Sequence, residues 1–328
     1  MENTRAKTTR NSLILLLTAT IWGMAFVSQS KGMDYMHPFT FNGVRSLIGA
    51  AGILVYILIS RKIAGDKATK LDWKLNVRAG LLCGIFLTIA STLQQFGIKY
   101  TSVGKAGFIT TLYIIFVPMF GIFLKKKVAP VVWAAAGMAA VGMYLLCMTE
   151  SLRLGAGDIM VFLCAIAFAI QIMTVDHYAA RIDGAVVSCI QFTVCGVVCC
   201  IGALIWGQPT FGQIQEGLGA LLYAGVLSCG VGYTLQIVGQ KGLNPTVAAL
   251  IMSLESVIAT ISGWIAYKIG FLSTDQTLTP RQIAGCVIVF AAVILVQLPP
   301  EWFRFGKKST YKERINSGKS AETVHKQI

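Results

Sequence analysis

The sequence predicts an all-α membrane protein in which ten transmembrane helices form two inverted repeats of five helices, with both termini in the cytoplasm. Three observations lead to this prediction. The 328 residues have a mean hydropathy of +0.69, and only 13% of them are charged, compared with about 25% in soluble domains. Long apolar runs recur along the whole chain, and the basic residues gather between alternate runs.

An apolar run of about 20 residues is long enough to cross a hydrocarbon core. We expect spans at residues 12–30, 39–60, 77–97, 103–124, 129–148, 158–176, 186–206, 217–238, 244–267 and 281–298. The connections leave no room for a soluble domain. The chain therefore divides into a cytoplasmic N-terminal segment (1–11), a first five-helix repeat (12–148), an external linker (149–157), a second five-helix repeat (158–298) and a basic cytoplasmic tail (299–328).

The basic residues indicate the orientation of these spans. Of the 28 Lys and Arg residues, 21 fall in the two ends of the chain and in the connections on the same side, and only six fall on the opposite side. Cytoplasmic loops are enriched in Lys and Arg, so both ends are assigned to the cytoplasm. The net charge of +14 then serves as an anchor near anionic lipid headgroups, and we expect no nucleic-acid partner.

A weak internal repeat supports the division into two halves. The segment Thr92-Leu93-Gln94 recurs as Thr234-Leu235-Gln236, and Tyr113 takes the position of Glu255 at the same offset of 142. Near the start of each half, Trp22 can be set against Phe168 at an offset of 146. Because five spans per half is an odd number, the halves enter the membrane in opposite directions. Inverted repeats are typical of carriers that expose a midplane site alternately to each side.

Two ionisable side chains, Arg45 and Glu255, lie inside apolar runs. A charge at bilayer depth costs about 3 kcal/mol or more, and such residues usually face a cavity or an ion path. The planar fork of Arg45 suits a substrate carboxylate; the alternatives are a cap on helix-end carbonyls or a side chain that extends to the interface. Burial favours a neutral carboxyl, so Glu255 could exchange a proton near neutral pH, attract an amino group, or form a structural ion pair or hydrogen bond.

Polar side chains at helical spacing mark one face in most spans. In span eight, for example, Cys229, Tyr233 and Gln236 align. Spans five and ten carry almost no polar groups, so they are expected to pack outside the cavity or to form the seam of a homodimer. The predicted substrate-binding or coupling residues are Glu255, Arg45, Trp22, Asn42, Tyr113, Gln171, Gln191, Tyr233 and Ser256.

The remaining motifs argue against other classes of protein. The nine cysteines and three histidines form no CxxC pair and no cluster with metal-ligand spacing, so we expect no metal and no cofactor. We expect no enzyme, because a catalytic site needs a nucleophile with a base, or clustered acids and histidines. Small cytoplasmic connections disfavour a structural or sensory protein, and a single chain offers no charged ring for a channel.

Several segments resemble EamA-type carriers of the drug/metabolite transporter superfamily. The stretch from Ile21 to Val27 is similar to their first-span motif, Pro38 with Arg45 to the start of the second span, the stretch from Gly97 to Ser102 to the end of the third, and Ser253-Leu254-Glu255 to the ninth. Ser256 replaces a frequent proline, so the resemblance implies no proline kink there. Lys125-Lys126-Lys127 replaces a Glu-Arg pair, so any ion pair of that glutamate is lost.

The resemblance implies ATP-independent movement of small polar metabolites, often amino acids or related compounds. We therefore expect a multi-pass secondary transporter of the bacterial cytoplasmic membrane that exports such a compound by alternating access, with proton coupling as a further hypothesis. Its partners would be the substrate, protons and membrane lipids. An uncoupled facilitator and a lipid-linked-sugar translocase are the alternatives.

The predicted topology can be tested with reporter fusions. Reporters placed after Lys126 and at the C-terminus should read cytoplasmic, and one placed after Arg153 should read external, because the positive-inside asymmetry orients the spans. The measurement is the ratio of alkaline phosphatase to green fluorescent protein signal at each site. An external C-terminus would require an odd number of spans and would remove the argument for inverted repeats.

Overall fold

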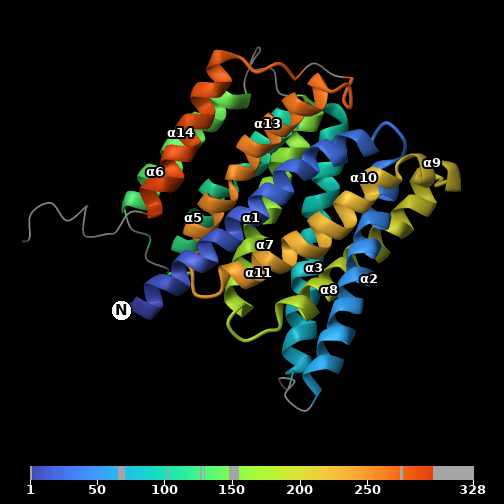
Figure 1. Cartoon of the computed structure of the whole chain (residues 1–328), viewed down its shortest axis with the longest axis horizontal. Helices are drawn as coiled ribbons and strands as arrows, with labels where there is room; N and C mark the ends of the chain where they lie inside the picture. The colour runs from blue at the N-terminus through green and yellow to red at the C-terminus, as the bar shows by residue number, and fades with distance from the viewer. Residues whose placement is uncertain are drawn as a thin grey trace, which may run out of the picture.

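The computed structural model describes residues 2–65, 71–101, 103–125, 128, 130–147, 155–273 and 276–297, and every regular element within these ranges is a helix (Figure 1). The expected basic tail, and the expected linker up to residue 154, lie outside the described residues. The elements are α1 (Glu2–Gly32), α2 (Pro38–Ala64), α3 (Trp73–Tyr100), α4 (Val103–Thr111), α5 (Tyr113–Phe123), α6 (Pro130–Cys147), α7 (Ala156–Tyr178), α8 (Gly184–Gly202), η2 (Ala203–Gly207), α9 (Phe211–Glu216), α10 (Leu218–Leu222), η3 (Tyr223–Gly232), α11 (Tyr233–Gln240), α12 (Pro245–Met252), α13 (Leu254–Lys268) and α14 (Pro280–Gln297).

Eight helical segments of the described chain are long and apolar enough to cross a membrane: Thr8–Gly32, Pro38–Ala64, Trp73–Tyr100, Val103–Phe123, Ala156–Tyr178, Gly184–Gly207, Leu218–Gln240 and Pro245–Lys268. They coincide with expected spans one to four and six to nine. At spans five and ten the apolar helices are shorter, Pro130–Gly142 and Pro280–Leu295. The all-helical, polytopic class is thus confirmed, while the ten-span inverted repeat stays a prediction.

Local sequence signals set the helix starts. Proline occupies the first turn of α2 and of α12, where its missing N–H would have no helical partner anyway. The Asn244 side chain accepts a hydrogen bond from the Thr246 amide at 2.9 Å. His37 caps α2 by accepting from the Phe39 amide at 3.4 Å. Burial and the nearby Lys99 lower the pKa of His37, which favours the neutral imidazole that this cap requires.

The helices pack in a crossed pattern between the two halves of the chain. α3 packs against α7 and α8, whereas α1 packs against α13, α11 and η3; α2 lies along α8 and η3. Close approach is achieved with small residues, as is usual for membrane helices. At the crossing of α3 and α7, a Cβ added to Gly157 would lie 2.9 Å from Tyr100 Cβ and 3.0 Å from the Gly97 carbonyl oxygen.

The helices of spans four and nine are both interrupted near their middle. The first breaks at Leu112 between α4 and α5, and the second at Ser253 between α12 and α13. At each break the carbonyl accepts from the amide three residues on, at 2.9 Å for Leu112 and 3.1 Å for Ser253. Ser253 Oγ also donates to the Leu250 carbonyl at 2.7 Å, a back-bond of the kind that bends helices. The break before Glu255 therefore forms without a proline next to it.

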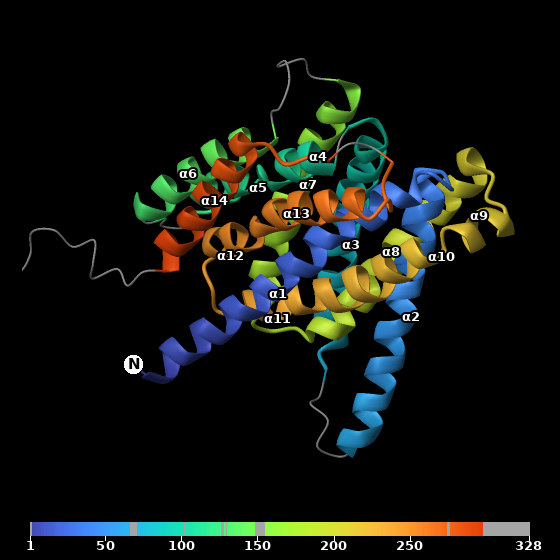
Figure 2. The same ribbon diagram turned by 45° about the horizontal axis from the view of Figure 1, so that its top comes forward.

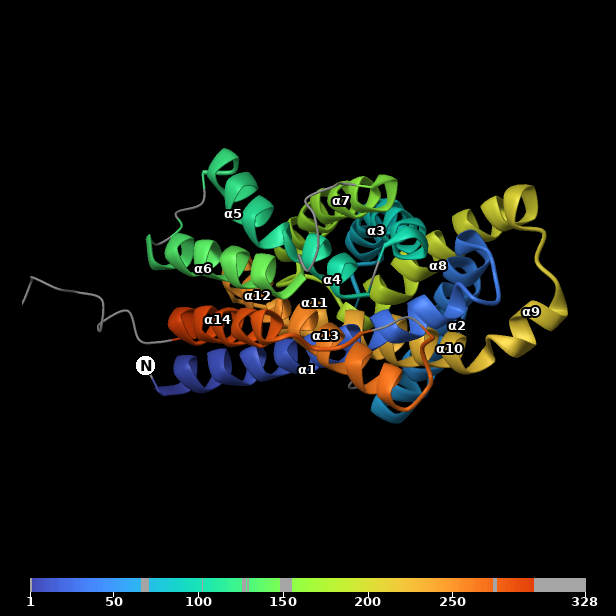
Figure 3. The ribbon, with the colours of Figure 1, turned by 90° about the horizontal axis from the view of Figure 1, so that it is seen from above.

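α2 and the pair α6–α14 mark the periphery of the molecule. The C-terminal turns of α2 extend beyond the other helices (Figure 2). α6 and α14 pack against each other and lie at one end of the molecule, with α9 at the opposite end (Figure 3). Both helices expose large apolar side chains such as Val141 and Phe290, which suits contact with lipid. The homodimer through these helices stays a prediction.

The close crossing of α3 and α7 gives a stability prediction. Gly157→Ala should lower the melting temperature in detergent, because overpacking costs about 1–3 kcal/mol. Gly219→Ala is the matched control, since a Cβ at that helical glycine meets nothing within 4 Å and alanine favours a helix over glycine. The measurement is a thermal-stability series followed by size-exclusion chromatography. Equal melting temperatures for both variants would show that the crossing tolerates the added atom.

Candidate functional site

A cavity lies at the centre of the described helices, where nine helical elements turn side chains toward one another. The cavity has a volume of about 30 Å³, which is room for about two water molecules. The cavity is therefore small in this conformation. The lining residues are Trp22, Phe26, Gln29, Arg45, Gln94, Thr110, Tyr113, Phe168, Gln171, Ile172, Ser228, Tyr233, Gln236 and Glu255.

Most of the sequence-predicted site residues meet here. Those that line the cavity are Trp22, Arg45, Tyr113, Gln171, Tyr233 and Glu255. The other three lie beside it and bond to protein groups. Asn42 Nδ2 donates to the Ser91 carbonyl at 2.8 Å, Gln191 Oε1 accepts from Gln171 at 3.5 Å, and Ser256 Oγ donates to the Ser253 carbonyl at 2.8 Å.

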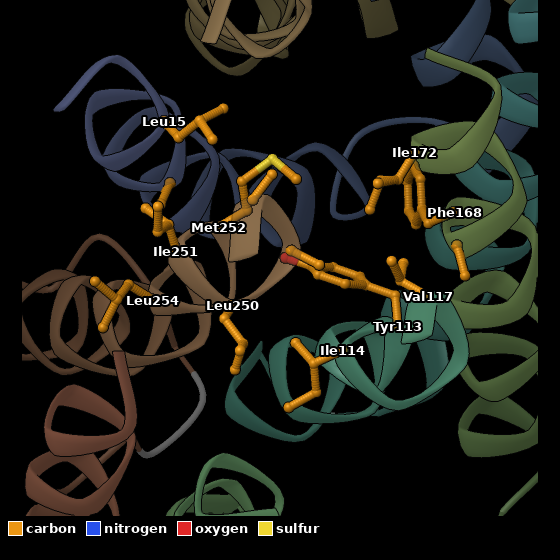
Figure 4. Packing of buried hydrophobic residues seen from close by; sticks show 14 of the residues in the cluster. Leu15, Tyr113, Ile114, Val117, Phe168, Ile172, Leu250, Ile251, Met252 and Leu254 are labelled. Atoms are coloured by element: carbon orange, nitrogen blue, oxygen red, sulfur yellow. The ribbon is translucent and has the colours of Figure 1, made fainter. Parts of the chain in front are cut away.

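Glu255 is held at the start of α13, just after the break in span nine. Its side chain is buried, with 4% of the residue exposed, and its Oε1 accepts a hydrogen bond from Tyr113 Oη at 3.0 Å. Figure 4 shows Tyr113 reaching from α5 toward the α12–α13 segment. The ion pairs found among the described residues, Lys31–Asp34 and Lys105–Asp158, do not include Glu255. The two helix breaks thus bring a hydroxyl and a carboxyl together without a neutralising cation.

α1 can approach Glu255 because Gly23 has no side chain. A Cβ at Gly23 would lie 2.7 Å from the Glu255 carbonyl oxygen and 2.6 Å from Ile258 Cβ. A second glycine makes room on the other side of the cavity, where a Cβ at Gly232 would lie 2.6 Å from Trp22 Nε1. Alanine at either position would push α1 away from the residues that line the cavity.

Arg45 faces the cavity from α2 and is 6% exposed. Its guanidinium lies 5.4 Å from the centre of the Phe41 ring, and its Nε has no hydrogen-bond partner among the described residues. The described ion pairs do not include it. A buried guanidinium with an unpaired donor binds a carboxylate or phosphate more strongly than an ammonium does, because its fork matches two oxygens at once.

Neutral polar groups complete the lining. Gln236 Nε2 donates to Gln171 Oε1 at 3.2 Å, and Gln94 Nε2 donates to Thr110 Oγ1 at 3.2 Å. Gln236 Oε1 and Trp22 Nε1 lack partners among the described residues. Unpaired buried donors and acceptors are costly, and a polar ligand in the cavity would satisfy them.

One wall of the cavity is aromatic. The rings of Trp22 and Tyr233 have centroids 4.5 Å apart, and Tyr233 meets Phe192 edge-on at 5.0 Å. Aromatic pairs of this kind add about 0.5–1.5 kcal/mol beyond the area they bury. The wall offers an apolar, polarisable surface beside the charged groups.

Residues matched by the internal repeat meet at this cavity. Gln94 and Gln236, Tyr113 and Glu255, and Trp22 and Phe168 all belong to the lining. The positions that the internal repeat matches in the sequence therefore lie close together in the structure.

Sequence reasoning missed Ser228, which lies in η3. The π-helical segment η3 brings Ser228 next to Tyr233, whose amide donates to the Ser228 carbonyl. The predicted face in this span instead placed Cys229 with Tyr233, four residues apart. Cys229 is buried outside the lining, because π-helical bonds link residues five apart.

An ion pair at one end of the helices was also missed. Asp158, in the first turn of α7, is 3% exposed, and its Oδ2 lies 2.6 Å from Lys105 Nζ. The same carboxylate accepts from Thr101 Oγ1 at 2.8 Å and from the Gly155 amide at 2.9 Å. It ties α7 to α4 and to the α3–α4 connection, on the side that the basic residues assign to the outside.

A counterpart without an acidic side chain holds the opposite end. Asn11 Nδ2 of α1 donates to the Lys241 carbonyl at 2.7 Å, and Lys241 Nζ donates to the Ile182 carbonyl at 3.3 Å. Each of these two end contacts joins the start of the first span of one half to the region that follows the third span of the other half. They differ in chemistry, since only the contact of Lys105 with Asp158 contains a buried charge pair.

A bundle of long apolar helices around a small polar cavity defines a multi-pass membrane protein. Comparison with known proteins identifies the family of this protein. The sequence model of the EamA-like transporter family matches residues 10–148 and, separately, residues 155–298. The chain therefore belongs to the EamA-like transporter family, within the drug/metabolite transporter superfamily.

Relatives in archaea and bacteria agree with this assignment. An uncharacterized transporter of Archaeoglobus fulgidus is 27% identical over 87% of this chain and 84% of its own length. The uncharacterized transporter YwfM of Bacillus subtilis is 24% identical over 88% of this chain and 94% of its own. A solved crystal structure shares the fold, with a TM-score of 0.67 at 16% identity over 88% of this chain and 96% of that one.

Proposed function

We propose that this chain is a secondary transporter that exports a small polar metabolite, an amino acid or related compound, by alternating access. The observation that carries the proposal is the small central cavity, in which Arg45 and Glu255 lie without ion-pair partners among the described residues. Separate matches of the family to residues 10–148 and 155–298 support two repeats at 12–148 and 158–298. Inverted repeats of this kind rock around a fixed midplane site.

The lining supports a zwitterionic substrate. Arg45 offers a bidentate contact for a carboxylate, and Glu255 offers an acceptor for an amino group. The pair of Trp22 and Tyr233, with centroids 4.5 Å apart, gives a surface for an apolar or aromatic side group. A substrate held by all three would satisfy the unpaired Trp22 Nε1 and Arg45 Nε.

Proton coupling is the finer part of the proposal. Glu255 and its hydrogen-bond donor Tyr113 follow directly after the breaks at Ser253 and Leu112. Broken helices let the two halves of a span move separately, so protonation of Glu255 and movement at the breaks can be linked. The end contacts of Lys105 with Asp158 and of Asn11 with Lys241 support alternation, because opening either end requires one contact to break while the other is kept.

Arg45→Lys should reduce transport about tenfold or more while membrane abundance stays near normal, because lysine keeps the charge but loses the planar fork. Uptake of radiolabelled amino acids into proteoliposomes measures this, after a thermal-shift screen of amino acids, nucleobases and polyamines has identified a ligand. The control is Arg10→Lys, at an exposed position near the start of α1. Full transport in both Arg45→Lys and Arg45→Ala would assign Arg45 a structural role.

Glu255→Gln should abolish the dependence of flux on a pH gradient and spare substrate binding, because the amide has nearly the volume of the carboxyl but cannot titrate. Flux into proteoliposomes with and without an imposed gradient is compared with the substrate-induced thermal shift. Tyr113→Phe is the companion variant: it removes the single hydrogen bond at 3.0 Å and leaves the carboxyl able to titrate, so gradient dependence should persist.

The outcomes separate the remaining hypotheses. Gradient-driven transport that survives in Glu255→Gln would rule out the proton-carrier role and favour an uncoupled facilitator. Joint loss of binding and transport would make Glu255 a substrate ligand. Normal binding with flux that ignores the gradient is the result that the proposal requires.

A further inference from the structure

A basic pocket of about 610 Å³ lies outside the central cavity, on the side of the molecule that the basic residues assign to the cytoplasm. Its walls come from the end of α2, the start of α3, the α7–α8 connection and α11. Three cations line it from three separate segments of the chain: Arg61, Arg181 and Lys241. None of them belongs to the ion pairs found among the described residues.

The two carboxylates in the same pocket are engaged elsewhere. Asp72 Oδ1 accepts from the Leu75 amide at 3.0 Å and caps α3. Asp183 Oδ1 accepts from the Ala185 amide at 2.9 Å and from the Val186 amide at 3.2 Å, and caps α8. Both charges therefore lie against positive helix N-termini. The pocket keeps a net attraction for anions.

The cations are partly positioned in advance. The Arg61 guanidinium lies 5.9 Å from the centre of the Trp73 ring, and Lys241 Nζ donates to the Ile182 carbonyl at 3.3 Å. A stacked guanidinium loses less conformational entropy when it binds a phosphate than a free side chain does.

An apolar groove of about 430 Å³ continues from this pocket along the membrane-facing side of α2 and the η3–α11 segment. Tyr56, Thr234 and Val238 line both spaces. Glycines widen the groove: a Cβ at Gly52 would meet nothing within 4 Å, and Gly230 faces it from η3. The groove and the basic pocket thus form one continuous surface, apolar at bilayer depth and basic at its end.

We propose that this surface binds one anionic phospholipid. An acyl chain would lie in the groove along Gly52 and Gly230, and the phosphate would lie among Arg61, Arg181 and Lys241. Charge complementarity selects the headgroup, because basic residues near the membrane surface attract anionic lipids. The length of apolar wall joined to the basic pocket selects a lipid over a free anion.

The test uses the purified full-length protein in a neutral detergent. Phosphatidylglycerol and phosphatidylcholine with the same acyl chains are added separately, and bound lipid is counted by native mass spectrometry beside the melting temperature. Wild-type protein should retain one phosphatidylglycerol and melt at a higher temperature with it than with phosphatidylcholine. Glycerol 1-phosphate is the probe for a free anion and should have no comparable effect.

Two variants and their controls separate the two parts of the site. The variant R61Q/R181Q/K241Q should bind phosphatidylglycerol about a hundredfold more weakly, whereas R10Q/K62Q/K74Q, which removes the same charge from exposed positions outside the pocket, should bind normally. Gly52→Leu fills open space in the groove and should also weaken binding. Gly219→Leu is its control, because a Cβ at that position likewise meets nothing within 4 Å.

Each contrary outcome overturns the proposal in a distinct way. Equal effects of the two lipids would remove headgroup selection. Equal losses in the two triple variants would leave only diffuse attraction to the surface. Full binding by Gly52→Leu, or a shift of equal size with glycerol 1-phosphate, would replace the phospholipid with a free anion.

Discussion

The absence of water in a hydrocarbon core constrains every polar group in this protein: each must find a protein partner or face an internal cavity. Arg45 and Glu255 satisfy this constraint because helices from both halves of the chain turn their polar faces to one place. Close packing of those helices depends in turn on glycine. Without Gly23 and Gly232, α1 could not approach α13 and η3 closely enough to bring Trp22 into the same lining. The cavity therefore depends on the glycines, which lack side chains, as much as on the positions of the polar residues.

The two helix breaks connect this static requirement to movement. A continuous helix keeps its polar groups satisfied but moves as one rod. At Leu112 and Ser253 the bonding shifts to residues three apart, so each span becomes two short helices that meet beside the cavity. Tyr113 directly follows the first break, Glu255 lies two residues after the second, and their side chains hydrogen-bond to each other. The two breaks are therefore joined by a hydrogen bond to Glu255, the one carboxyl group in the described lining of the cavity.

The sequence predicted the parts of the site that follow from repetition and from regular helices. Trp22, Tyr113 and Glu255 could be found because positions matched by the internal repeat line one cavity. Ser228 could not, because a π-helical segment changes the spacing of residues on a face, and the sequence carries no clear signal for it. The ion pair of Asp158 and Lys105 escaped notice because charges near the ends of apolar runs usually face solvent. α6 and α14, with 18 residues each, occupy expected spans five and ten.

The two proposed repeats differ at the end of α2 that the basic residues assign to the cytoplasm, and the difference has a physical use. α2 continues as a regular helix to Ala64, whereas its counterpart α8 ends at Gly202 and passes into η2. The last turns of α2 carry Tyr56 and Arg61 into the groove and the basic pocket. Anionic lipids are enriched in the cytoplasmic leaflet, so a headgroup site suits that side. The same helix carries Arg45 into the cavity about four turns earlier, so a lipid bound along α2 would stabilise the helix that positions the guanidinium for its substrate.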